Sequence, residues 1–322
     1  MSLQIRSGGP YPPKSAGLGG EPTTVPDIPV CGVFMFLYLC FAVANMTIFQ
    51  RNRRRGKKFV LSAVLFGFCM ARTTTLVLRI AWATRPTNIK LAIAAQVMVN
   101  AGVLIVYIVN FICAQRIVRA RQPNIGWNPI LRIGSRVLYG SIGGALVMVI
   151  TAMVVSLYTL NPHTLKQCRD VELAALTYLL TFTCLPIVQI AVALLPPRSK
   201  DQETFGEGSA RGQVIIITLS SCLCMLIAGF KAGAMWSPPR PITNPAWYDS
   251  KACFFVFNFT LEILILFLLT LTRIDKRFWV PNGSNQPGDY TRLREQIPFQ
   301  SEMEPTHFGP DIAKEANYRP RI

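Results

Sequence analysis

Four ionisable residues lie within long apolar stretches of this sequence, and they are the first candidates for chemistry. They are Arg72, Arg79, Lys231 and Glu262. An ionised side chain removed from water is costly unless it is paired or reaches a polar cavity, so each residue indicates either a partner or a site. Arg72 and Glu262 are expected at equal depth. Their ion pair would either lock two helices together or form part of a binding site.

The charges within the apolar stretches do not balance, because three cations accompany a single anion. Uncharged polar side chains lie near them at helical spacing: Gln96 and Asn100 share one stripe, and Asn258 lies one turn from the anion. The sequence therefore predicts a ligand-binding site formed by Arg72, Arg79, Gln96, Asn100, Lys231, Asn258 and Glu262. Its surplus positive charge would suit a carboxylate or a phosphate. The alternative is that the uncharged members only hydrogen-bond neighbouring helices, at about 1 kcal/mol each.

Signatures of catalysis and of metal binding are missing from the sequence. The two histidines, His163 and His307, lie in polar segments, and the nine cysteines have no paired metal-ligand spacing. There is also no Gly-rich phosphate loop, serine elbow or carboxylate pair on one helix. We therefore expect neither an enzyme nor a metal or cofactor site. Cys168 and Cys253 fall at the same predicted face, where a disulfide could join them.

The elements that must position these residues are apolar stretches of about twenty residues. The chain of 322 residues is 51% hydrophobic and only 15% charged, whereas roughly 25% charged is usual for a soluble domain. A helix of ~20 residues spans a bilayer core of about 30 Å, and runs without alternation favour helices over barrel strands. The sequence predicts an all-α, seven-span transmembrane bundle over residues 28–277. Its spans are expected at about 28–49, 59–83, 89–114, 137–160, 173–195, 214–236 and 253–272.

Basic residues cluster on one side of these spans. The clusters fall within 51–58, 116–136, 198–211 and 273–277. Cytosolic loops carry the excess of Lys and Arg, so this side is predicted to be cytosolic, with the C-terminus there and the N-terminus outside. The net charge of +17 is then explained by anionic lipids of the inner leaflet. No nucleic-acid partner is expected, because the basic residues form no continuous face with interleaved aromatic residues.

Both ends of the chain are rich in proline, glycine and polar residues. Residues 1–27 are predicted to be a disordered extracytosolic tail, and residues 278–322 a disordered cytosolic tail. Nothing in the spans distinguishes a plasma membrane from an internal one.

Several phrases of the sequence are distinctive. They are Trp82–Asn88 with Leu91–Gln96, Asn244–Tyr248 with Ser250–Cys253, Asn258–Glu262, and Val280–Gly283. Together they resemble a family of fungal multi-pass integral membrane proteins that is classed as a domain of unknown function. The resemblance covers roughly residues 30–290 and implies a filamentous fungal source and a seven-span architecture. It supplies no activity.

Two hypotheses of function follow from these observations. The first is a receptor-like or transport-related membrane protein for a small anionic or amphipathic molecule. The second is a non-catalytic accessory or scaffolding membrane protein, in which the polar residues only hold helices together. Both hypotheses have the lipid bilayer as the principal partner.

Overall fold

The fold is built from long apolar helices. The computed structural model describes residues 10–11, 15–197 and 199–292. Among these residues no β-strand forms, and one isolated bridge pairs Ser15 with Pro241. Within the same part of the chain, seven helical segments are long and apolar enough to cross a membrane: Asp27–Arg54, Val60–Thr84, Ile89–Arg121, Pro129–Tyr158, Pro162–Leu194, Ala210–Trp236 and Lys251–Leu271. The prediction of an all-α fold with seven long apolar helices is confirmed.

Five of the seven segments are single helices, and two are interrupted. The single helices are α1 (Asp27–Arg54), α2 (Val60–Thr84), α6 (Pro129–Tyr158), α7 (Pro162–Leu194) and α8 (Ala210–Trp236). The third segment is divided into α3 (Ile89–Gly102) and α4 (Leu104–Arg121), and the seventh into α9 (Lys251–Phe255), the π-helix η2 (Val256–Thr260) and α10 (Leu261–Leu271). Short helices form at α5 (Pro123–Gly126), η1 (Trp247–Asp249) and α11 (Ile274–Arg277).

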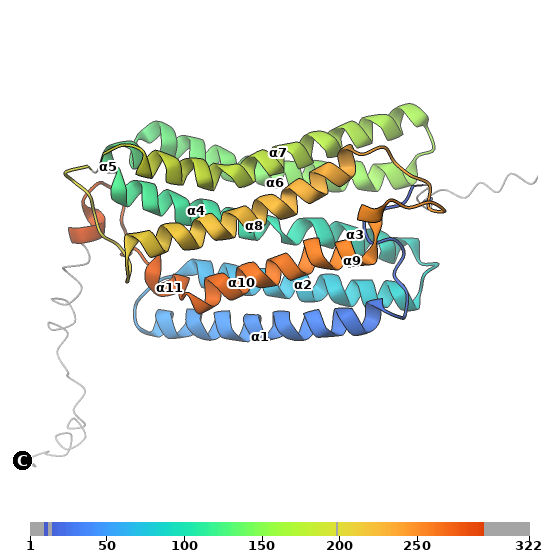
Figure 1. Ribbon diagram of the computed structural model, residues 1–322, viewed down its shortest axis with the longest axis horizontal. Helices are drawn as coiled ribbons and strands as arrows, with labels where there is room; N and C mark the ends of the chain where they lie inside the picture. The colour runs from blue at the N-terminus through green and yellow to red at the C-terminus, as the bar shows by residue number, and fades with distance from the viewer. Residues whose placement is uncertain (1–9, 12–14, 198, 293–322) are drawn as a thin grey trace, which may run out of the picture.

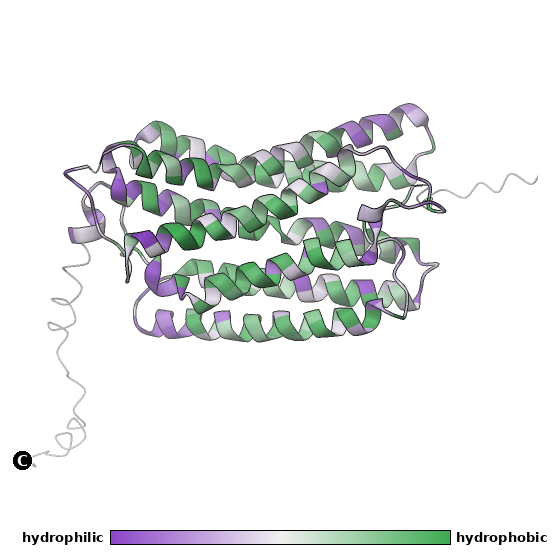
Figure 2. Cartoon of the chain, in the orientation of Figure 1, coloured by the Kyte–Doolittle hydropathy of each residue, from purple (hydrophilic) through white to green (hydrophobic). Residues whose placement is uncertain are grey.

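The long helices run side by side along the long axis, and the connections gather at the two ends (Figure 1). Hydrophobic residues dominate the middle of the bundle and hydrophilic residues its ends (Figure 2). We call the end formed by residues 51–59, 116–128, 199–209 and 273–292 the basic end, and the end formed by 15–26, 85–88, 159–161 and 237–250 the opposite end. An apolar belt between two polar ends is the pattern of a bundle that crosses a bilayer.

The helices extend beyond the apolar runs from which they were predicted. α7 begins at Pro162 and not near residue 173, because the Asn161 side chain accepts a hydrogen bond from the amide of His163 and caps the helix. α6 likewise begins at Pro129, where Asn128 accepts from the amide of Ile130. Hydrophobicity predicted the part of each helix that meets lipid, whereas caps decide where the helix starts.

The core is built from α1, α2, α4, α7, α8 and the seventh segment, and one aromatic cluster in it joins α1, α2 and the seventh segment. Tyr38, Phe68 and Phe259 are fully buried there. The Tyr38 ring packs edge to face against both phenylalanines, with its centroid 6.1 Å from that of Phe68 and 6.4 Å from that of Phe259. Many apolar residues also face outward, and Phe36 and Val43 of α1 are each 66% exposed. Helices that are apolar on both the inner and outer faces are those of a membrane bundle.

The predicted tails are described only in part, since residues 1–9, 12–14 and 293–322 lie outside the described residues, as does Arg198. The described part of the N-terminal segment follows the opposite end, where the amide of Gly19 donates to the carbonyl of Asp249 at 3.0 Å. Residues 278–292 return to the basic end. There the Glu203 carboxylate accepts hydrogen bonds from the amides of Gly288 and Tyr290, each at 2.8 Å.

Candidate functional site

Arg72 and Glu262 form an ion pair in the middle of the bundle, between α2 and α10. Both side chains are fully buried. Arg72 Nε donates to Glu262 Oε2 at 2.6 Å, and Nη2 contacts the other carboxylate oxygen. The contact is therefore bidentate, the strongest geometry for a guanidinium with a carboxylate.

The remaining donors of Arg72 are also used. Nη1 donates to the carbonyl oxygens of Val99 at 2.8 Å and Met98 at 3.4 Å, next to the interruption between α3 and α4. A Cβ on Gly102 would lie 3.0 Å from the guanidinium, so glycine permits this close approach. A cation at the carboxyl end of a helix hydrogen-bonds the last carbonyl groups and interacts favourably with the negative end of the helix dipole. Every nitrogen of the Arg72 guanidinium thus has an acceptor within the protein.

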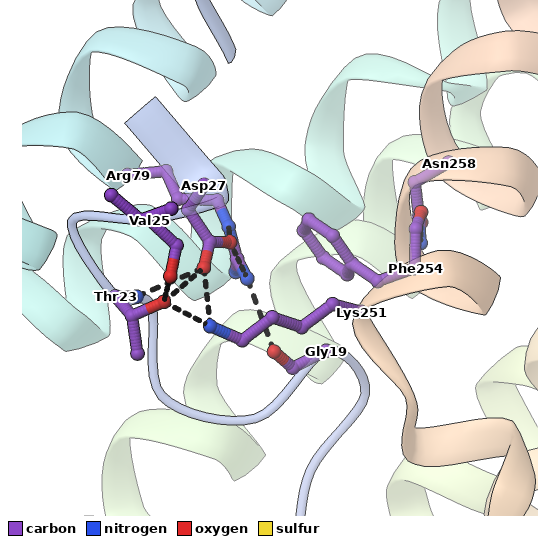
Figure 3. Close-up of polar contacts among 8 residues, drawn as sticks. All are labelled: Gly19, Thr23, Val25, Asp27, Arg79, Lys251, Phe254 and Asn258. Atoms are coloured by element: carbon purple, nitrogen blue, oxygen red, sulfur yellow. Dashed lines mark hydrogen bonds and ion pairs between the residues drawn. The ribbon is translucent and has the colours of Figure 1, made fainter. Parts of the chain in front are cut away.

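Arg79, the second predicted cation, pairs with Asp27 (Figure 3). Arg79 Nε and Nη2 donate to Asp27 Oδ1 at 3.0 and 2.7 Å, and the two side chains are 4% and 1% exposed. Asp27 lies in the first turn of α1, where a negative charge also stabilises the helix. Arg79 therefore has a counter-charge within the protein.

The Asp27 carboxylate also gathers a second cation and the N-terminal segment. Its other oxygen accepts from Lys251 Nζ at 2.5 Å and from the amide of Thr23 at 2.9 Å. Arg79 Nη2 donates in addition to the carbonyl of Gly19 at 3.1 Å. Gly19 has a φ of +80°, and a Cβ there would lie 2.5 Å from the Phe254 ring. Figure 3 shows these groups converging from three parts of the chain.

Lys231 differs from both arginines. It lies on α8, is 8% exposed, and its Nζ is buried without a hydrogen-bond partner in the part of the chain that the structure describes. No ion pair of Lys231 occurs among those residues either. A buried polar group that is left unsatisfied costs about 1–3 kcal/mol, and an ionised one costs more. Lys231 is thus the one member of the predicted cation set without a described counter-charge.

A small cavity of about 30 Å³ lies beside Lys231. Asn100 and Tyr107 supply its other polar side chains, and the rest of the lining is apolar: Val103, Leu104, Leu146, Val149, Leu176, Leu179 and Ala228. The structure therefore brings together Lys231 and Asn100 of the predicted site. A space of this size holds about one water molecule or one small polar group.

Gln96 and Asn258 lie elsewhere. Gln96 is half-buried, and its amide lies next to Gly17 of the N-terminal segment. Asn258 lies in η2, where Nδ2 donates to the carbonyl of Phe254 at 3.0 Å and Oδ1 is buried without a described partner. Figure 3 shows Asn258 apart from the Asp27 carboxylate. The predicted site is therefore divided among separate clusters.

A larger cavity of about 610 Å³ opens at the opposite end, between α6, α7, α8 and the loop 237–241. It begins one helical turn beyond the small cavity: Glu172 lines the larger space and Leu176 the smaller one, while Met235 lies one turn from Lys231. One turn of helix is 5.4 Å, so the two cavities are close neighbours along the bundle.

The cysteines and potential metal ligands add no further site. Cys168 and Cys253 are both free thiols, so the suggested disulfide is not formed in this structure. Cys168 lies within the first turns of α7, and Cys253 Sγ donates to the carbonyl of Trp247 at 3.6 Å. Across residues 10–11, 15–197 and 199–292, no cluster of three or more His, Cys, Asp or Glu side chains could hold a metal ion.

Comparison with known protein families gives one match. A family described as "Protein of unknown function (DUF3112)" matches residues 206–279. The matched segment includes α8 and the interrupted seventh segment, and therefore Lys231 and Glu262. No curated protein matches the chain, and no solved structure does. The match supports the resemblance to a domain of unknown function over residues 206–279, and it supplies no activity. A fungal source stays a prediction.

Two residues of these clusters were missed by sequence reasoning. Asp27 was assigned to the N-terminal tail, although an acidic residue at the start of an apolar run is a signal of a helix N-terminus. Tyr38, whose hydroxyl donates to Glu262 Oε2 at 3.0 Å, lies in an apolar run where an aromatic residue gives no separate signal. Their roles depend on which helices become neighbours.

We predict that single substitutions of the central ion pair are strongly destabilising. Glu262→Gln leaves Arg72 buried without a counter-charge, and Arg72→Met does the same to Glu262, so each should lower the free energy of unfolding by about 3–5 kcal/mol. The double variant Arg72→Met, Glu262→Met should recover part of this loss. Thermal midpoints of the purified protein in mild detergent measure the effect, and singles as stable as the unsubstituted protein would contradict the pairing.

We predict that Asp27 holds the N-terminal segment against the opposite end. Asp27→Asn removes the charge shared by Arg79 and Lys251 and should speed hydrogen exchange at residues 15–26. Lys251→Gln is the milder comparison, because the lysine side chain is 28% exposed and contributes less. Exchange at residues 15–26 that is unchanged in Asp27→Asn would refute the anchoring role.

Proposed function

We propose that this protein is a receptor-like or transport-related membrane protein that binds a small amphipathic anion in the half of the bundle nearer the opposite end. The observation that carries the proposal is the Lys231 amine, buried beside a cavity and without a described partner. A positive group kept at this depth without an anion of the protein is most simply explained by an anion that arrives from outside.

The charge balance supports Lys231 as the centre of the site. Arg72 pairs with Glu262, and Arg79 pairs with Asp27, so each arginine already has a carboxylate partner, whereas Lys231 has none among the described residues. The Asn100 side chain next to Lys231 offers an amide donor. A carboxylate that reached this position would accept hydrogen bonds from both residues and would hold the lysine as an ammonium.

The sizes of the two cavities decide how such a ligand would lie. The space of about 30 Å³ beside Lys231 has room for a head group and not for a whole molecule. The neighbouring cavity of about 610 Å³ falls within the range of ordinary ligand pockets, roughly 300–1,000 Å³. The body of the ligand would occupy the larger cavity, with its anionic group directed to Lys231 along the apolar walls of α6 and α7.

The proposal includes an orientation in which the opposite end is extracytosolic. Its support is the excess of Lys and Arg at the basic end, which the positive-inside bias assigns to the cytosol. The larger cavity would then open to the outside, as a receptor for an external molecule or the outer gate of a transporter requires.

We predict that Lys231→Met removes anion binding without harming the fold. Full-length protein in phosphatidylcholine nanodiscs should gain thermal stability from dodecanoate, and less from dodecanol or dodecyltrimethylammonium, because binding to the folded state raises the midpoint. Lys231→Met should lose the dodecanoate shift, while its own midpoint stays equal or rises by the equivalent of about 1–3 kcal/mol.

Two controls accompany this measurement. Lys231→Arg keeps the cation and should retain a dodecanoate shift, and Lys90→Met removes an exposed lysine and should behave as the unsubstituted protein. The same dodecanoate shift in the unsubstituted protein and in Lys231→Met would overturn the assignment of Lys231. No shift in the unsubstituted protein would overturn the amphipathic carboxylate as the ligand class.

We predict that the two ends of the chain lie on opposite sides of the membrane. An epitope tag at the C-terminus should be digested by protease in sealed microsomes, whose cytosolic face is outward, whereas an N-terminal tag should be protected until detergent is added. Protection of the C-terminal tag would reverse the orientation.

A further inference from the structure

A polar pocket of about 110 Å³ lies at the basic end, far along the bundle from Lys231. Its walls come from the end of α1 and the turn that follows, from the loop before α8, and from α11 with Trp279, two residues beyond it. The charged and aromatic members of the lining are Arg55, Lys57, Glu207, Asp275, Lys276 and Trp279.

Hydrogen bonds hold the parts of this pocket together. The turn after α1 is closed by Lys57, whose amide donates to the carbonyl of Asn52 at 3.0 Å. Asn52 Nδ2 in turn donates to Asp275 Oδ2 at 3.0 Å and so joins α1 to α11. The amide of Glu207 donates to the carbonyl of Lys276 at 2.9 Å, which fixes the third wall. The pocket is therefore a built feature of the fold.

The two carboxylates in the lining are already matched. Asp275 is 4% exposed and accepts from Arg273 at 2.9 and 3.0 Å as well as from Asn52. Burial alone would raise the pKa of Asp275, but these hydrogen bonds hold it below its ordinary value, so the group is an anion with its acceptors used. Glu207 lies 3.7 Å from Lys276 Nζ.

Positive charge is left over on the other wall. Within the part of the chain that the structure describes, neither Arg55 nor Lys57 has an ion-pair partner. Lys57 Nζ lies 5.0 Å from the centre of the Trp279 ring, a cation–π contact that leaves its N–H groups available. The Trp279 Nε1–H is a donor only, and it is buried without a described acceptor. Arg55, Lys57 and an indole with an unsatisfied N–H thus line one small space.

We propose that this pocket binds the phosphate of an anionic membrane phospholipid with a small head group, such as phosphatidic acid. The unpaired cations Arg55 and Lys57, beside carboxylates that already have ion-pair partners, favour an anion with several oxygens, which a phosphate provides. A volume of about 110 Å³ equals that of a few water molecules and excludes a large head group. A lipid is the source that the position favours, because the pocket lies where the helices leave the apolar belt and tryptophan is typical of that interface.

The proposal is tested with full-length protein released from nanodiscs of phosphatidylcholine that contain a minor fraction of phosphatidic acid. Native mass spectrometry then counts the phosphatidic acid that stays bound. The double variant Arg55→Gln, Lys57→Gln should lose about tenfold or more in retained lipid, because it removes two charged donors. The matched control is Arg54→Gln, Lys58→Gln, which removes the same charges from neighbouring positions outside the pocket lining.

Each outcome decides the proposal. Equal loss in both double variants would mean a diffuse basic surface and would overturn the pocket. Trp279→Phe keeps the ring but removes the N–H, so partial loss there supports the site even if the double variant folds poorly. Displacement of the lipid by glycerol 3-phosphate at equal concentration would mean a soluble anion and would overturn the lipid assignment. Lys231→Met should retain phosphatidic acid, which separates this proposal from the one for the opposite end.

Discussion

The contact between the Arg72 guanidinium and the Glu262 carboxylate is the interaction on which the rest of the bundle depends. It joins α2 to α10, receives α1 through the Tyr38 hydroxyl, and caps the broken end of α3 through the carbonyl of Val99. A buried ion pair is stable only when its geometry is good and its donors and acceptors are matched, and here the matching holds four helical segments in one arrangement. The π-helix η2 ends at Thr260, two residues before Glu262, and such insertions are frequent at functional sites.

Lys231 stands out because Arg72 and Arg79, the other two cations of the predicted site, both have ion-pair partners. Arg79 is used to fix the N-terminal segment over the opposite end, through Asp27 and Gly19, so that segment becomes part of the wall around the larger cavity. Lys231, one turn inward, is left with apolar neighbours and Asn100. The free-energy cost of burying the unpaired Lys231 amine is explained if a bound anion completes the site. The third and seventh segments are interrupted, as are the broken helices near the binding sites of many transporters.

The two ends of the bundle distribute charge in different ways. At the opposite end the Asp27 carboxylate pairs with two cations, and the cavity of about 610 Å³ at this end is lined by both polar and apolar residues. In the pocket at the basic end the two acids pair with Arg273 and Lys276, whereas Arg55 and Lys57 have no ion-pair partner among the described residues. We therefore propose two chemically distinct sites, one for a small molecule inside the bundle and one for a lipid head group at the basic end. A substitution in either site should leave binding at the other intact.

The sequence by itself determined the fold class and the approximate position of every span. The length of an apolar run is a local property, and it decides whether a helix can cross the hydrocarbon core of a bilayer. It also identified Arg72 with Glu262 as a pair, since the two fall at equal depth. Helix ends at Asn128 and Asn161 depended on caps that hydrophobicity does not register. Only the tertiary structure decided that Asp27 neutralises Arg79, that Gln96 and Asn258 lie away from Lys231, and that Cys168 and Cys253 stay free. These outcomes depend on which helices become neighbours and how each is rotated, and depth along a single helix does not contain that information.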